Sequence, residues 1–239
     1  MKPSGEIVVG ADSCPVGWFV TVLDGVSLKT KTHEQFEDVV ATHRDVKRIL
    51  VDIPIGLPRD QRRRCDIEAK DLLGCRGGSV FFSPSERAAR HEDYDCANEA
   101  HRQSIGHGLS QQAHAICDKI NEVATVVDDR YDGLVRESHP ELCFAALNGQ
   151  PIAYSKSSER GRYLRMHLLS EELTNAVECY RDARNEYLLK EVRRDDIIDS
   201  MVLAVSARSE ALTMVPPNPS SDEPRIYYPE FDVPAVKVD

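Results

Sequence analysis

The chain contains no run of eighteen or more apolar residues, the length at which an apolar segment becomes a candidate membrane-spanning helix. Its first residues, MKPSGEIVVGAD, pass directly into a strand-like pattern instead of forming the charged and apolar segments of a secretion signal. We therefore expect a cytoplasmic protein that has no membrane partner.

Closely spaced cysteines are also missing. The seven cysteines are scattered along the sequence, and no two of them form a CxxC pair. Zinc ribbons draw on such pairs, and small disulfide-stabilised domains draw on a dense, even-numbered set. The pattern argues against both classes, and it predicts that most of the thiols are buried as small apolar side chains.

The common phosphate-binding and nucleophile motifs are absent as well. The sequence has no GxxxxGK[ST] loop, no GxGxxG after a strand and no GxSxG turn. These absences argue against a P-loop nucleotide hydrolase, a Rossmann dinucleotide-binding protein and an α/β-hydrolase.

Positive charge is scarce relative to negative charge. The chain has 30 Lys and Arg against 40 Asp and Glu, for a formal net charge of −10. Nonspecific binding to duplex nucleic acid relies on neutralisation of phosphates by Lys and Arg. We therefore expect long duplexes to be poor partners and any nucleic-acid site to be local.

The chain is long enough and apolar enough for one sizeable core. It has 239 residues, of which 41% are hydrophobic. We predict a single domain over residues 1–211 and a Pro-rich tail over residues 212–239, in which RIYYPEF can add an edge strand. The sequence leaves the oligomeric state open.

The order of apolar runs predicts the class of fold. Runs at residues 6–12 and 18–23 flank the turn segment SCPVG and indicate a hairpin. A third strand is expected at 26–30, a helix at 33–43 and a buried strand at 48–53. This βββαβ order predicts an α/β fold with a mixed central sheet flanked by helices. A largely helical insertion is expected at about 56–130, and a last helix at 195–211.

Four aspartates stand where a divalent metal ion can be bound. Asp12 and Asp52 end apolar, strand-like runs, and Asp196 and Asp199 lie one turn apart at the head of an apolar helix. Carboxylates are the ligands that Mg²⁺ prefers, and neighbouring carboxylates repel one another unless a cation lies between them. We expect Asp12, Asp52 and at least one of the helix pair to converge. The alternatives are that Asp196 caps the helix and that Asp12 forms a turn.

A second group of candidate residues lies in the segment ESHPELCF. Glu137 and His139 share a face if the segment is a strand, and Glu141 falls in the first turn of the helix that follows. Glu137 or Glu141 can orient a water molecule or complete the metal shell, and His139 can act as an acid or a base. An acid in a first helical turn is also favoured by the helix dipole alone.

Basic residues form two further groups. The segment KSSERGRYLR contains Lys156, Arg160, Arg162 and Arg165, which we predict to bind the phosphate of a substrate. The segment DQRRRCD contains Arg62, Arg63 and Arg64. A solvated helix face is the alternative for both groups, and it is the favoured interpretation of the arginine triplet.

Several segments together resemble one family, the domain-of-unknown-function family numbered 429. The segments are GADSCPVGW, VDIPIGLP, RCDIEAKDLLG, SVFFSP, GLSQQAHAICDKINEV, ESHPELCF, SKSSERGRYLR and DDIIDSMVLA. They cover most of residues 6–211. The resemblance implies a predicted nuclease of RNase H-like fold. Within that superfold the pattern of acids is similar to the metal site of Holliday-junction resolvases, which implies that the ligands here are Asp12, Asp52, Asp196 and Asp199.

The sequence therefore predicts phosphodiester hydrolysis that depends on Mg²⁺ or Mn²⁺, with single-stranded or structured nucleic acid as the partner. One alternative is a phosphotransferase or nucleotide hydrolase on the related actin-like fold, in which the SCPVG turn would cradle phosphate. The other is a non-catalytic module that binds a ligand or a partner and in which the acids are structural.

Overall fold

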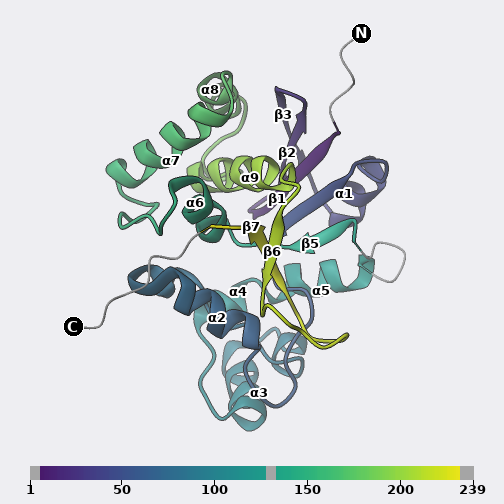
Figure 1. The fold of residues 1–239 in the computed structure, drawn as a ribbon. Helices are drawn as coiled ribbons and strands as arrows, with labels where there is room; N and C mark the ends of the chain where they lie inside the picture. The colour runs from purple at the N-terminus through teal and green to yellow at the C-terminus, as the bar shows by residue number, and fades with distance from the viewer. Residues whose placement is uncertain (1–5, 128–132, 232–239) are drawn as a thin grey trace, which may run out of the picture.

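The centre of the molecule is a five-stranded mixed sheet (Figure 1). The structure is a computed structural model that describes residues 6–127 and 133–231. The strands are β1 (Val8–Cys14), β2 (Gly17–Asp24), β3 (Ser27–His33), β4 (Arg48–Asp52) and β5 (Val135–Glu137), arranged in the order β3-β2-β1-β4-β5. Three antiparallel strands and two parallel ones, flanked by helices, form an RNase H-like α/β fold, so the predicted fold class is confirmed.

The first hairpin forms where the SCPVG segment predicts it. Strands β1 and β2 pair antiparallel with Cys14 opposite Gly17, which leaves a two-residue turn. Gly17 has a φ of +132°, and a Cβ atom there would lie 2.1 Å from the carbonyl oxygen of His33. The turn therefore requires glycine for both conformation and space.

The third strand is longer than the sequence pattern predicts. It ends at His33, which pairs with Trp18 in β2, and the helix α1 (Phe36–Thr42) begins only afterwards. The predicted helix at 33–43 started too early because periodicity does not show how far pairing with β2 extends the strand. Helix α1 then returns the chain to β4, which runs parallel to β1 with Asp52 beside Asp12.

A helical segment separates β4 from β5. It contains the helices α2 (Arg64–Leu73), α3 (Tyr94–Ile105), α4 (Gln111–Ala115) and α5 (Cys117–Val126) and the 3₁₀ turns Gly74–Ser79 and Ala88–Arg90. Figure 1 shows α2 and α3 below the sheet, with α5 alongside it. Strand β5 then joins the sheet parallel to β4.

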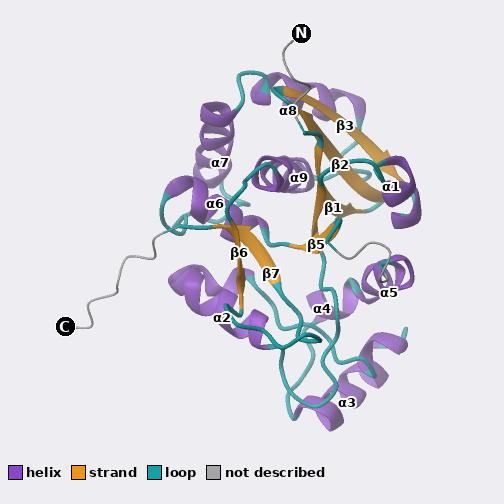
Figure 2. Ribbon diagram, turned by 45° about the vertical axis from the view of Figure 1, so that its right-hand side comes forward, coloured by secondary structure: helices purple, strands orange, loops and turns teal. Residues whose placement is uncertain are grey.

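The remaining helices surround the other face of the sheet (Figure 2). They are α6 (Pro140–Asn148), α7 (Glu159–Glu172), α8 (Ala176–Glu186) and α9 (Arg194–Ala207). Helix α9 is buried from Asp196 to Ala207 and packs on β1, β2 and β4. A Cβ atom on Gly10 would lie 2.1 Å from the Ser200 carbonyl oxygen, so glycine at this position lets the helix approach the strand closely.

A short hairpin follows α9. Strands β6 (Leu212–Val215) and β7 (Ile226–Pro229) pair with each other, and one bridge joins Tyr227 to Ser138 beyond β5. Tyr228 and Val215 belong to the same apolar cluster as α9. Strand β7 thus forms within the predicted RIYYPEF segment, with β6 as its partner. Among the residues that the structure describes, no helix has the length and apolar character needed to cross a membrane.

Candidate metal centre

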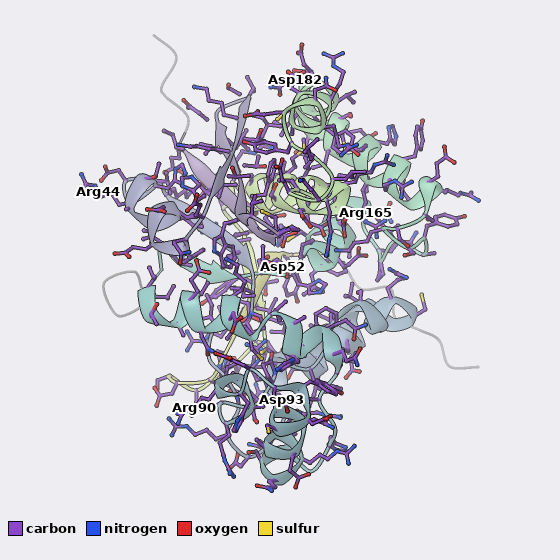
Figure 3. All side chains as sticks on the ribbon, turned by 180° about the vertical axis from the view of Figure 1, so that it is seen from behind. Arg44, Asp52, Arg90, Asp93, Arg165 and Asp182 are labelled. Atoms are coloured by element: carbon purple, nitrogen blue, oxygen red, sulfur yellow. The ribbon has the colours of Figure 1, made fainter. Side chains whose placement is uncertain are left out.

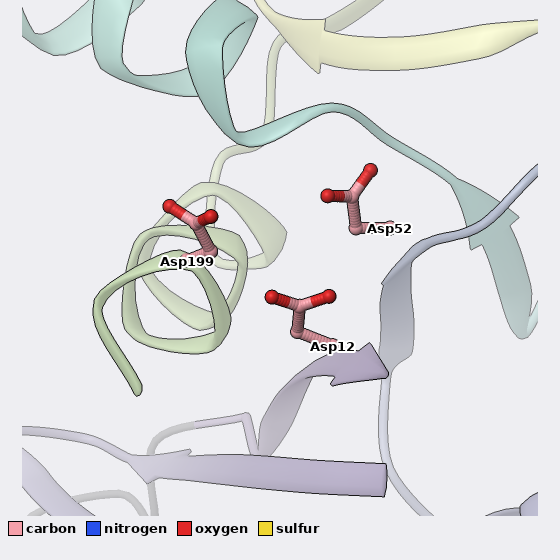
Figure 4. Close-up of side chains that lie close together, drawn as sticks. All are labelled: Asp12, Asp52 and Asp199. Carbon is pink, nitrogen blue, oxygen red and sulfur yellow. The ribbon is translucent and has the colours of Figure 1, made fainter. Parts of the chain in front are cut away.

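Three aspartates converge at one end of the sheet. Asp12 ends the register shared by β1 and β4, Asp52 lies beside it, and Asp199 approaches from α9 (Figure 4). One carboxylate oxygen from each of the three lies within 4.8 Å of the others. This confirms the expected convergence, and the group is of a size that can hold a metal ion.

Burial makes the negative charge of this group unfavourable. Asp12 and Asp199 are buried and Asp52 is partly buried. Burial, followed by the charges of Asp52, Asp196 and Asp199, raises the pKa of Asp12 well above its usual range. Burial likewise raises the pKa of Asp52 to about 7. A divalent cation among the three carboxylates would relieve both effects.

Lys156 supplies the nearest positive charge. Its ammonium donates to Asp199 Oδ2 at 2.6 Å and lies 3.6 Å from Asp195 Oδ2. Burial opposes its charged form, but the carboxylates of Asp199 and Asp12 outweigh this effect and raise the pKa of Lys156. Lys156 thus brings one positive charge to a group of three carboxylates.

Asp199 also carries an unpaired oxygen. The residue has 0% exposure, and its Oδ1 finds no hydrogen-bond partner among the described residues. A buried carboxylate oxygen without a donor is unfavourable, and a metal ion is a partner that would satisfy it. The donor set of three carboxylates therefore fits a hard divalent cation.

Asp196 lies near the group but has a local role. Its Oδ2 accepts a hydrogen bond of 2.8 Å from the backbone N–H of Arg193 at the start of α9. Burial raises its pKa to about 6. Asp196 lines the same cleft without belonging to the cluster of three. It helps to cap α9 from the third position of the helix, whereas the N-cap position that the alternative gave it is occupied by Arg193.

Both predicted glutamates are held by arginines. Arg63 donates from Nη2 to Glu137 Oε1 at 2.6 Å and from Nη1 to Oε2 at 2.8 Å. Arg165 donates to Glu141 Oε1 at 2.7 Å and to Oε2 at 2.8 Å. All four residues are buried. These ion pairs fix the walls of the cleft and occupy the oxygens that would otherwise face water.

His139 is positioned by the start of α6. Its Nδ1 accepts a hydrogen bond of 3.2 Å from the backbone N–H of Glu141, so the ring hydrogen of the neutral form lies on Nε2. Burial lowers the pKa of His139. The residue lines the cleft beside the carboxylates.

The four residues predicted to bind phosphate do not gather in the cleft. Lys156 lines it, whereas Arg165 is buried against Glu141 (Figure 3). Arg160 lies over the ring of Tyr154, 4.2 Å from its centre, and Arg162 donates to the Ser157 carbonyl. Helical periodicity does not show which partner each of these side chains contacts. The sequence therefore could not show that Lys156 alone of the four lines the cleft.

The cleft itself has a volume of about 520 Å³. Besides the carboxylates it is lined by Arg76, Phe81 and Arg193, which belong to none of the predicted site groups. Arg193 directly precedes the acidic helix, and Arg76 and Phe81 flank the short Gly-Gly-Ser-Val segment. Phe81 lies within the family-like segment SVFFSP, and Arg76 and Arg193 lie close to such segments. That proximity is the signal that could have found them.

The fold and the site together define a class: an α/β protein of RNase H-like fold with a buried carboxylate cluster that can hold a metal ion. A family model described as "Protein of unknown function (DUF429)" matches residues 10–221, and the chain belongs to this family. The resemblance predicted from the sequence is thereby confirmed. No curated protein and no solved structure matches the chain.

Proposed function

We propose that this protein is a nuclease that hydrolyses phosphodiester bonds and depends on Mg²⁺ or Mn²⁺. The observation that carries the proposal is the unpaired Oδ1 of Asp199 in a cluster of three converging carboxylates. Asp12, Asp52 and Asp199 would hold the ion, which when bound supplies a Lewis acid for a phosphate oxygen and lowers the pKa of water.

The residues around the cluster have supporting roles in this proposal. Lys156 donates a hydrogen bond to Asp199 beside the cluster. In this proposal its ammonium would instead donate to a phosphate oxygen once the substrate is bound. The pairs of Glu137 with Arg63 and of Glu141 with Arg165 hold β5 and α6 in place beside the cluster. His139 lines the cleft, where the backbone N–H of Glu141 holds its ring through Nδ1.

A panel of labelled substrates tests the proposal. Single strands, hairpins, RNA–DNA hybrids, four-way junctions and free nucleotides are incubated with Mg²⁺ or Mn²⁺ and with the wild type or Asp12→Asn. We expect the wild type to cleave a nucleic-acid member and Asp12→Asn to be inactive. Asp182→Asn, on the exposed surface of α8, is the matched control because it removes the same charge far from the cleft (Figure 3).

The second candidate is a non-catalytic binding module, and the ion pair between Lys156 and Asp199 favours it. In that case a lysine ammonium serves as the permanent counter-charge of the cluster. Equal behaviour of wild type and Asp12→Asn towards every substrate would support this candidate. Turnover of free nucleotides alone would instead support a nucleotide hydrolase.

A further inference from the structure

A second cavity adjoins the carboxylate cleft. It has a volume of about 340 Å³ and lies in the helical segment between β4 and β5. Gly78, Val80 and Phe81 line both this cavity and the cleft, so the two are separated only by this short stretch of chain.

The charge of the second cavity is opposite to that of the cleft. Its described lining contains Arg62, Lys70 and His101 but no Asp or Glu. The cleft, in contrast, is lined by the aspartates of the cluster and by both glutamates. In a chain with a net charge of −10, a cavity that excludes carboxylates and gathers cations is suited to an anion.

Arg62 is held in the cavity by an aromatic ring and not by an acid. Its guanidinium lies over Phe82, 3.8 Å from the ring centre, and its Nε finds no hydrogen-bond partner among the described residues. The neighbouring arginines differ: Arg63 is paired with Glu137 and Asp66, and Arg64 with Glu68. Stacking on a ring face orients a guanidinium while leaving its donors available.

Lys70 and His101 add fixed donors. The Lys70 ammonium donates to the Gly77 and Val80 carbonyls at 2.8 and 2.6 Å, which leaves one of its three hydrogens. His101 is 2% exposed, and its Nδ1 accepts a hydrogen bond of 2.9 Å from the Ser85 N–H. Its neutral form therefore carries hydrogen on Nε2, as a donor towards the cavity that it lines.

Phe81 stands at the boundary between the two cavities. It is 45% exposed although it is a large apolar side chain. Exposed aromatic rings beside a basic groove are the platforms on which single-stranded nucleic acid stacks its bases. Phe81 borders both the carboxylate cleft and the second cavity.

We propose that the second cavity binds a phosphate of a single nucleic-acid strand, while Phe81 stacks a base and another phosphodiester of the same strand lies at the carboxylate cluster. This inference rests on the proposed nuclease function. It names the substrate class as an unpaired strand with at least two phosphates. A free mononucleotide cannot fill both cavities, and a base inside a duplex is not available to Phe81.

Binding measurements test the second cavity separately from catalysis. A labelled oligothymidylate of ten nucleotides is titrated with protein in Mg²⁺, and fluorescence anisotropy reports binding. The protein carries Asp12→Asn alone or together with Arg62→Gln, Phe81→Ala or Arg64→Gln. We expect Arg62→Gln and Phe81→Ala each to weaken binding about tenfold, from the loss of a charged hydrogen bond or of a stacked base. Arg64→Gln removes the same charge from the neighbouring exposed arginine and should leave affinity unchanged.

The salt dependence of binding distinguishes a phosphate contact from a structural effect. Loss of one phosphate contact lowers the slope of log affinity against log salt by about 0.7 for a single strand. Arg62→Gln should show this decrease, while Phe81→Ala should weaken binding without it. Thermal melting of each variant shows whether it remains folded. Arg62→Gln loses the contact with Phe82 as well as the charge, so a second variant is needed. Arg62→Lys keeps the positive charge and should therefore retain the slope measured with Arg62 in place.

The outcomes separate the two proposals. Equal affinity of the Arg62→Gln and Arg64→Gln proteins would overturn the proposal that the second cavity binds phosphate, even if the wild type cleaves strands. Binding that depends on Arg62 and Phe81, with no difference in cleavage between wild type and Asp12→Asn, would overturn the nuclease and keep the cavity. If no strand binds and the wild type cleaves none, both are overturned.

Discussion

Asp52 is the most accessible of the three clustered carboxylates, since the other two are buried. A change to Asn removes one negative charge and keeps the volume of the side chain. We expect Asp52→Asn to abolish Mn²⁺ binding, measured by calorimetry. In the metal-free protein at pH 8, where Asp52 with its pKa of about 7 is mostly ionised, the same change relieves repulsion, and Tm should rise by about 2–4 °C, as about 1 kcal/mol does for a chain of this size. Asp182→Asn should change neither quantity. A large loss of metal-free stability would show that Asp52 is instead a structural hydrogen-bonding group.

The raised pKa of Asp52 sets the direction of a pH effect. Its value is about 7 in the folded protein against 3.8 for the free side chain, with burial as the largest cause. Between these values the folded state binds a proton that the unfolded state releases, so stability falls as pH rises. Metal-free protein should therefore melt at a lower temperature at pH 8 than at pH 5.5, and the difference should be smaller in Asp52→Asn.

Manganese should reverse this trend, because protons and the cation compete for the same oxygens. The increase in Tm on addition of Mn²⁺ should be larger at pH 8 than at pH 5.5. An increase that is equal at both values would contradict a site made of these carboxylates.

At the scale of elements, the ion pair between Arg165 of α7 and Glu141 of α6 connects two helices. Both side chains are nearly inaccessible. Removing one partner of such a pair leaves the other charge buried, which costs about 3–5 kcal/mol. Arg165→Met should therefore lower the free energy of unfolding by about this amount, measured in urea. Arg44→Met, on an exposed surface, is the control (Figure 3). A loss no greater than that of the control would show that the pair contributes little.

The order of the elements follows from the sequence because local patterns carry it. Alternation and turn residues predict the hairpin, and the apolar run before Asp52 predicts β4. Asp12 and Asp52 meet because β1 and β4 are parallel, so that the carboxyl ends of both strands lie at one edge of the sheet. These predictions need only contacts between neighbouring elements.

The choice between Asp196 and Asp199 needs more than spacing. Both lie on one face of α9, but the rotation of that helix over β1 decides which carboxylate joins the cluster. Close contact at Gly10 fixes this rotation, and no helical pattern reports it. The partners of Glu137 and Glu141 are equally hidden, as Arg63 lies 74 residues from the first and Arg165 lies 24 residues from the second.

At the scale of the whole molecule, the excess of negative charge opposes a long phosphate chain outside the two cavities. We expect the protein to cleave a single strand in Mg²⁺ and to act little on the same strand annealed to its complement. Activity on the single strand should fall with added salt, with a slope of about −1.4 if two phosphates are contacted. Gel analysis of paired reactions measures both effects, and equal cleavage of duplex and single strand would contradict the expectation.

The helical segment between β4 and β5 contains one of the two groups of residues proposed to contact the substrate and not the other. Arg62, Lys70, Phe81 and His101 all belong to this one uninterrupted stretch, whereas the three clustered aspartates lie outside it. If both proposals hold, substitutions within a single stretch of the gene can alter which strand is bound without changing the residues that would hold the ion. Relatives of this protein would then be able to differ in the strands that they bind while keeping the same three aspartates.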